Sequence, residues 1–247
     1  MFDFFVVRDA LRIDQFENRW LSRSLFLFVF FLTAAYTAWP LGNPDISATT
    51  DWLLSLYKSE SFRRNLTFTI PPDVIGNLIF TLSGLLFTFV LLFFVMYEMT
   101  LYCCDKKKMT LRSILKLFFS RLPLLFILLA LFFFFTLFPL VNIVIYAWGI
   151  PAFFLSPALL IFDRMNPIDA LIYSYRSTKG LRLRIFFSVF SLYIFHSFLQ
   201  NFAAVFFSGS RAGWALIYGF LRAFFLVAAG RLWGIMYEKL LKSSIHL

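Results

Sequence analysis

Metal-ligating side chains are scarce in this sequence, and their scarcity excludes several classes of enzyme. Of its 247 residues only 2 are histidine and 2 are cysteine. The histidines, His196 and His246, lack the spacing of metal ligands, and Cys103 and Cys104 are adjacent and cannot form a CxxC site. No glycine-rich phosphate loop, zinc-binding helix motif or nucleophile elbow occurs. We therefore expect no enzymatic activity, no metal and no cofactor.

Apolar residues, in contrast, are abundant. A hydrophobic fraction of 61% with 37 phenylalanines is more than one water-soluble core can cover, because a soluble domain of this size presents a largely polar surface. The apolar runs are continuous rather than alternating, which favours helices over a barrel. The sequence predicts an all-α polytopic membrane helix bundle in a single integral membrane domain over residues 1–247.

Six apolar stretches have about the 20 residues that a helix needs to cross the hydrocarbon of a bilayer. The predicted spans cover residues 25–41, 74–96, 122–140, 141–162, 185–207 and 214–236. None of these spans contains Asp or Glu. This absence argues against a carboxylate proton relay and hence against a proton-coupled pump.

The basic residues are distributed unequally between the two sets of loops. One set carries most of them: Arg8, Arg12, Arg19, Arg23, Lys106, Lys107, Lys108, Arg112, Lys116, Arg121, Arg164, Arg176, Lys179, Arg182, Arg184, Lys239 and Lys242. The other set has only Lys58, Arg63, Arg64 and Arg211. By the positive-inside rule both termini are cytoplasmic. The same residues would attract anionic lipid headgroups, whereas their separation among loops argues against a nucleic-acid partner.

Two segments have the pattern of helices that lie in the membrane interface. In the first, apolar residues recur at helical spacing with charges between them: Val6, Ala10, Ile13, Phe16 and Trp20. The second follows the second span and has the same pattern: Leu111, Ile114, Leu115, Phe118 and Phe119. We expect both to lie flat on anionic lipid.

The longest external loop runs from Gly42 to Asp73. Ser47 or Thr50 is expected to cap a short helix in which Trp52 and Leu53 share a face with Leu56 and Tyr57. This helix would dock onto the membrane or onto a protein partner, and the membrane is the favoured alternative.

Helix breakers mark the fourth span. Gly149, Pro151 and Pro157 lie inside it, and Pro139 and Asn142 predict a tight external turn before it. A broken helix of this kind can form a binding site in a transporter. A kink that serves packing is the favoured interpretation, because Gly and Pro are frequent in membrane helices.

A helix is predicted in the loop after the fourth span, with Asn166 as its cap, Pro167 at its first position and Gly180 at its end. The sequence around it, Pro157-Ala-Leu-Leu-Ile-Phe-Asp163-Arg-Met165 followed by Pro167-Ile-Asp-Ala170-Leu, Ser174, Ser177 and Lys179-Gly180, resembles the YciC-like family of bacterial inner-membrane proteins. That family has no assigned activity. The resemblance implies a location in the bacterial inner membrane and supplies no catalytic residues.

Polar residues within the last two spans are the candidate ligand-binding residues. His196, Gln200 and Asn201 in the fifth span and Arg222 and Tyr218 in the sixth lie at similar distances from the connecting loop. Antiparallel helices would therefore place them at one depth. They form either a pocket in which Arg222 holds an anionic headgroup or substrate, or an interhelical hydrogen-bond cluster that aligns the hairpin. The second interpretation is favoured.

Three residues close to the end of the sixth span complete the pattern. Arg231 is expected to extend its charge to the cytoplasmic surface, and Gly230 and Gly234 to allow close approach of another helix or of a second copy. The predicted role is that of a non-enzymatic factor in membrane or envelope homeostasis, acting on lipids, on a membrane protein partner or as a homo-oligomer. The alternative is a small transporter with an anion- or lipid-binding site at Arg222.

Overall fold

The computed structural model describes residues 4–12, 19–58, 70–106, 109–136, 145–207 and 209–244. Every regular element in these ranges is helical. Four helices contain stretches long and apolar enough to cross a membrane: α2 (Arg19–Ala38), α4 (Pro72–Lys106), α10 (Arg182–Phe207) and α11 (Arg211–Ser244). The all-α prediction is confirmed, and these helices contain the predicted first, second, fifth and sixth spans, apart from residues 39–41 after α2.

The second crossing stretch is longer than predicted. It runs from Pro72 to Cys104, whereas the predicted span ended at Met96. The added residues include Glu98, which is only 1% exposed. The expectation that no apolar helix carries a carboxylate is therefore wrong, because a boundary placed at the first charged residue cut the helix short.

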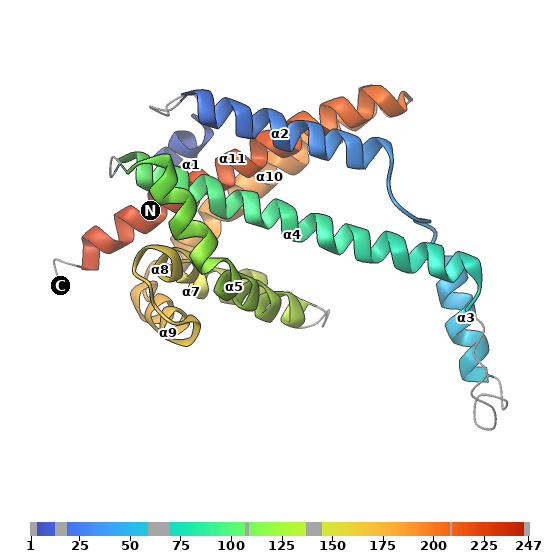
Figure 1. Cartoon of the computed structure of the whole chain (residues 1–247), viewed down its shortest axis with the longest axis horizontal. Helices are drawn as coiled ribbons and strands as arrows, with labels where there is room; N and C mark the ends of the chain where they lie inside the picture. Colours follow the sequence, from blue (N-terminus) through green and yellow to red (C-terminus); the bar gives the residue numbers. More distant parts are fainter. Residues whose placement is uncertain are drawn as a thin grey trace.

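Helix α11 is the central element, and it packs against α2, α4 and α10 (Figure 1). Small residues permit the close contacts. A methyl group at Gly219 would lie 3.0 Å from Cβ of Ala34 on α2, and one at Gly230 would lie 2.7 Å from the carbonyl oxygen of Val95 on α4. Gly230 and Gly234 both face α4 of the same chain. Since van der Waals packing drives helix association in lipid, these glycines serve the fold of one copy.

The buried core has two parts. The larger lies where α4, α11, α5 (Leu111–Thr136) and α8 (Ser156–Phe162) meet, and it contains Met99, Phe118, Leu159 and Leu232. The smaller joins α2 to α4 and α11. Outside these contacts α2, α4 and α10 expose large apolar side chains, such as Phe28 at 58% and Phe198 at 65%. An apolar exterior of this extent matches lipid rather than water.

In the first helix, α1 (Phe4–Leu11), the apolar side chains from Val6 onward pack against protein. Val6 and Ala10 are 2% and 0% exposed, and they belong to the larger core, where α1 packs on α11 and α10. The expected interfacial helix is therefore held by protein contacts. Of the other residues in its predicted pattern, Ile13 and Phe16 lie outside the described residues.

The predicted interfacial segment after the second span is continuous with the third predicted span. Helix α5 runs unbroken from Leu111 through Pro123 to Thr136, with Ile114 and Phe118 buried in the core. Ile114 and Phe118 of the predicted interfacial segment thus pack against protein, whereas Leu111 and Phe119 are exposed, and the position of the segment at the membrane surface stays a prediction. The end of the third predicted span, the start of the fourth and the turn at Pro139 and Asn142 lie outside the described residues.

In the connection between α2 and α4, α3 (Ser47–Lys58) forms at the start of α4 (Figure 1). Its first amide, that of Ser47, donates to Oδ1 of Asp45 at 2.9 Å, so Asp45 takes the capping role expected of Ser47 or Thr50. Asn77 of α4 holds this turn: its Nδ2 donates to the Asp45 carbonyl at 3.1 Å, and its Oδ1 accepts from Thr49 at 3.0 Å. The loop is thereby attached to α4.

The fourth predicted span is broken into η2 (Ile145–Gly149), α7 (Ile150–Phe153) and α8 (Ser156–Phe162). Proline and a break remove helical donors, so the carbonyl groups here need other partners. Side chains supply them. The Ala152 carbonyl accepts from Ser174 at 3.1 Å and from Thr178 at 3.0 Å, while the Phe153 carbonyl accepts from Ser156.

Two further bonds complete the arrangement. The amide of Leu155 donates to Oγ of Ser174 at 3.1 Å, and the indole of Trp233 on α11 donates to the carbonyl of Phe154. Ser174 lies on α9 (Pro167–Ser177), whose predicted start at Pro167 is confirmed and which Gly180 follows with a φ of +85°. Because the carbonyls at the break are engaged within the protein, the packing interpretation of the prolines is the better supported one.

Candidate anion site between α10 and α11

His196 lies on the face of α10 that packs against α11. Its side chain is 5% exposed, and its ring stacks on Phe225 with 4.3 Å between centroids. The charge of Arg222 interacts electrostatically with the His196 imidazole. The expected proximity of the two residues across the hairpin is thus observed.

Three nitrogen atoms in this layer are buried without a hydrogen-bond partner among the residues that the structure describes. They are Nε2 of His196, Nε2 of Gln200 and Nε of Arg222. Gln200 lies one helical turn after His196, so both side chains project from the same face of α10. We call these three residues the anion layer. Amide and guanidinium N–H groups only donate, and imidazole Nε2 donates in one of its tautomers.

The charge of Arg222 has no acidic counterpart on the helices around the layer. Helices α2 and α10 contain no Asp or Glu, and on α11 the first is Glu238. Glu98 of α4 interacts with Arg231 instead. Arg222 lies about 16 Å along α11 from Arg211, at about 1.5 Å per residue, so it is well inside the apolar stretch. A cation in such a position is costly unless an anion accompanies it.

Two more residues belong to the predicted site. Asn201 is exposed on α10. Tyr218, one helical turn before Arg222, is partly buried and packs its ring on Trp214, with 5.5 Å between centroids. Their membership in the site stays a prediction.

A second buried polar pair was missed by the sequence prediction. Glu98 of α4 and Arg231 of α11 are 1% and 4% exposed, and their charges interact. Arg231 does not extend to the surface as expected; its guanidinium carbon lies 5.7 Å from the centre of the Tyr102 ring. One sequence feature could have indicated that Glu98 is buried: the apolar run continues beyond it, from Met99 to Cys104.

No known protein family, curated protein or solved structure matches this chain. The resemblance to the YciC-like family accordingly stays a hypothesis. Within the described ranges, no three His, Cys, Asp or Glu side chains cluster as ligands for a metal ion. The functional interpretation rests on the geometry of the chain itself.

Proposed function

We propose that this protein is a non-enzymatic membrane protein that binds an anionic ligand, either a lipid headgroup or a small anion, in the anion layer between α10 and α11. It would lie in a bacterial inner membrane with six crossings and both termini in the cytoplasm. The excess of Lys and Arg in one set of loops supports this orientation.

The observation that carries the proposal is the set of buried donors beside a positive charge. Buried N–H groups without partners cost free energy, as does a cation in lipid without an anion. A phosphate or carboxylate would satisfy both requirements, since its oxygens accept hydrogen bonds and carry negative charge. An interhelical bonding cluster explains the donors less well, because Nε2 of His196, Nε2 of Gln200 and Nε of Arg222 form no hydrogen bond to one another.

Binding, rather than transport through the broken fourth segment, is the function that the contacts favour. In transporters a broken helix offers its exposed carbonyls to a substrate. Here the carbonyls of Ala152, Phe153 and Phe154 already accept hydrogen bonds from side chains. The break thus supports packing, and the anion layer supports a ligand.

Native mass spectrometry of the protein extracted with its lipids tests the proposal. Wild type should retain an anionic lipid or metabolite, and Arg222→Ala should lower its retention roughly tenfold, as expected for loss of a charge-assisted hydrogen bond. Arg222→Lys should give an intermediate result. Arg211→Ala, at the exposed start of α11, is the matched control. Equal retention in wild type and Arg222→Ala, with both proteins folded, would contradict the proposal.

The topology has a separate test. Cys103 and Cys104 would first be replaced by alanine. Lys179→Cys or Arg211→Cys would then introduce a single cysteine, and each protein would be treated with a membrane-impermeant maleimide. The proposed orientation requires labelling at position 211 in intact cells from which the outer barrier has been removed, and at position 179 only after the inner membrane is permeabilised. The reverse pattern would invert the topology.

A further inference from the structure

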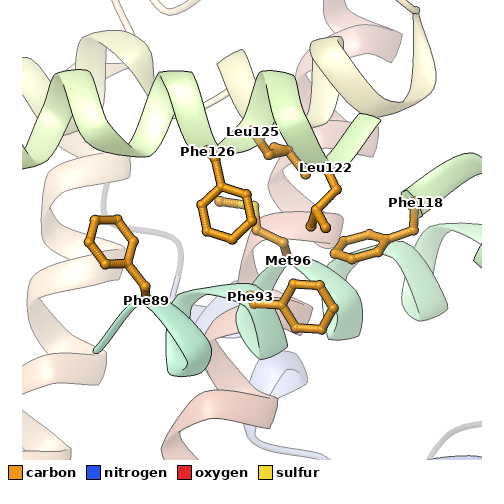
Figure 2. Close-up of a pocket in the computed structure, with 7 residues that line it drawn as sticks. All are labelled: Phe89, Phe93, Met96, Phe118, Leu122, Leu125 and Phe126. Atoms are coloured by element: carbon orange, nitrogen blue, oxygen red, sulfur yellow. The ribbon is translucent and has the colours of Figure 1, made fainter. Parts of the chain in front are cut away.

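An apolar hollow lies between α4 and α5, on helices different from those of the anion layer (Figure 2). Its atom-free space is about 230 Å³, including the part that opens at the surface. The lining consists only of apolar side chains: Phe89, Phe93, Met96, Phe118, Leu122, Leu125 and Phe126. No lining group can donate or accept a strong hydrogen bond, so the hollow suits a hydrocarbon ligand.

Aromatic contacts hold the two helices together along the hollow. At the end closer to the start of α5, the Phe118 ring packs edge-on against Phe93, with 4.7 Å between centroids. At the deeper end, Phe89 and Phe126 approach to 6.3 Å. Met96 and Leu125 are buried between these pairs. The lining thus extends along both helices, as Figure 2 shows.

A basic residue adjoins the lining. Arg121 immediately precedes Leu122, is partly buried, and has neither an ion pair nor a hydrogen bond among the described residues. Helix α5 carries no acidic residue from Leu111 to Thr136 that could pair with Arg121. A polar cationic end followed by an apolar channel complements a ligand with an anionic head and a hydrocarbon tail.

We propose that this hollow holds one acyl chain of an anionic phospholipid whose phosphate is bound by Arg121. Burial of the methylene groups and attraction of the phosphate by a nearby cation both favour binding, so the hydrocarbon chain and the headgroup contribute together. The charge favours a lipid over a helix of a protein partner, since an apolar partner helix would leave Arg121 uncompensated. This site does not depend on the anion layer.

The test uses the full chain, stripped of lipid and then incubated with phosphatidylglycerol or phosphatidylcholine in equal amounts, with bound lipid counted by native mass spectrometry. Wild type should retain phosphatidylglycerol preferentially. Arg121→Gln should lower that retention about fivefold, the equivalent of about 1 kcal/mol. Leu122→Trp, which fills the hollow, should lower the retention of both lipids.

Two variants on the same helix serve as controls. Lys116→Gln removes an equal charge outside the lining, and Ile127→Trp adds an equal bulk at a side chain that is 57% exposed. Both should retain phosphatidylglycerol as wild type does. The proposal would be overturned if Arg121→Gln and Lys116→Gln lost equal amounts of phosphatidylglycerol, or if wild type showed no preference for the anionic lipid. Crosslinking of the hollow to a second copy or to another protein would overturn it as well. The loss caused by Arg121→Gln should be the same in the presence and in the absence of Arg222→Ala, so the two sites can fail independently.

Discussion

Glu98 on α4 and Arg231 on α11 are both buried where the two helices pack closely, and their side chains interact electrostatically. Gly230, adjacent to Arg231, lies against Cβ of Glu98, and no larger residue would fit there. The guanidinium also lies over the ring of Tyr102. Close packing and charge therefore act at one place. Together they hold α11, which carries Arg222 of the anion layer, against α4.

The pair should be far less tolerant of a single change than of a double one. Glu98→Gln removes the carboxylate that interacts electrostatically with Arg231 and should lower the free energy of unfolding. The double variant Glu98→Leu with Arg231→Met should recover most of that loss, since no buried charge remains. Thermal unfolding in detergent measures both. Arg8→Gln, at an exposed residue, is the control, and a double variant less stable than Glu98→Gln would contradict the expectation.

Close packing at Gly230 gives a second prediction. Gly230→Ala places a methyl group against Cβ of Glu98 and 2.7 Å from the carbonyl of Val95, so the two helices must separate. Overpacking of this kind costs about 1–3 kcal/mol. Gly209→Ala is the matched control, because a methyl group there meets nothing within 4 Å. Equal unfolding temperatures for the two variants would show that α4 can shift at no cost.

The broken fourth segment should depend on two hydroxyl groups of the α9 region. Replacing Ser174 by Ala and Thr178 by Val removes both donors to the Ala152 carbonyl, and the buried acceptor left behind should cost about 1–3 kcal/mol. Ser177→Ala, on the same helix but outside this network, should have no such effect. Proteolysis within residues 145–180 would reveal local opening in the double variant, and equal cleavage of both proteins would contradict the expected role.

The turn before α3 should respond to acid. Hydrogen bonds from Ser47, that of its backbone amide foremost, hold the pKa of Asp45 below its ordinary value. A carboxyl group with a depressed pKa stabilises the folded turn above its ordinary pKa, and the contribution is lost as pH falls through the depressed value. Hydrogen exchange at the Ser47 amide should therefore lose protection at low pH in wild type.

Asp45→Asn provides the comparison for that turn. Its Oδ1 can still accept the Ser47 amide, but it does not titrate, so protection at Ser47 should become independent of pH in this range. The same acid response in Asp45→Asn would assign the effect to another group.

Much of the secondary structure could be predicted from the sequence. Long apolar runs require helices in lipid, because no other segment satisfies its own backbone there. The start of α9 followed from Asn166 and Pro167, and its end from Gly180, whose φ of +85° is unfavourable for other residues. Counting residues from the connecting loop was enough to place His196 near Arg222, since the antiparallel hairpin leaves little freedom.

Tertiary packing decided what each polar residue does. Val6 and Ala10 cover the core rather than lipid, Glu98 is buried rather than at the membrane surface, and Ser174 completes a broken helix instead of belonging to an exposed loop. An apolar helical face looks the same in sequence whether lipid or protein covers it. The sequence by itself thus determined the helices and the connection of the last two, whereas the choice of partner for each face arose only from close packing in three dimensions.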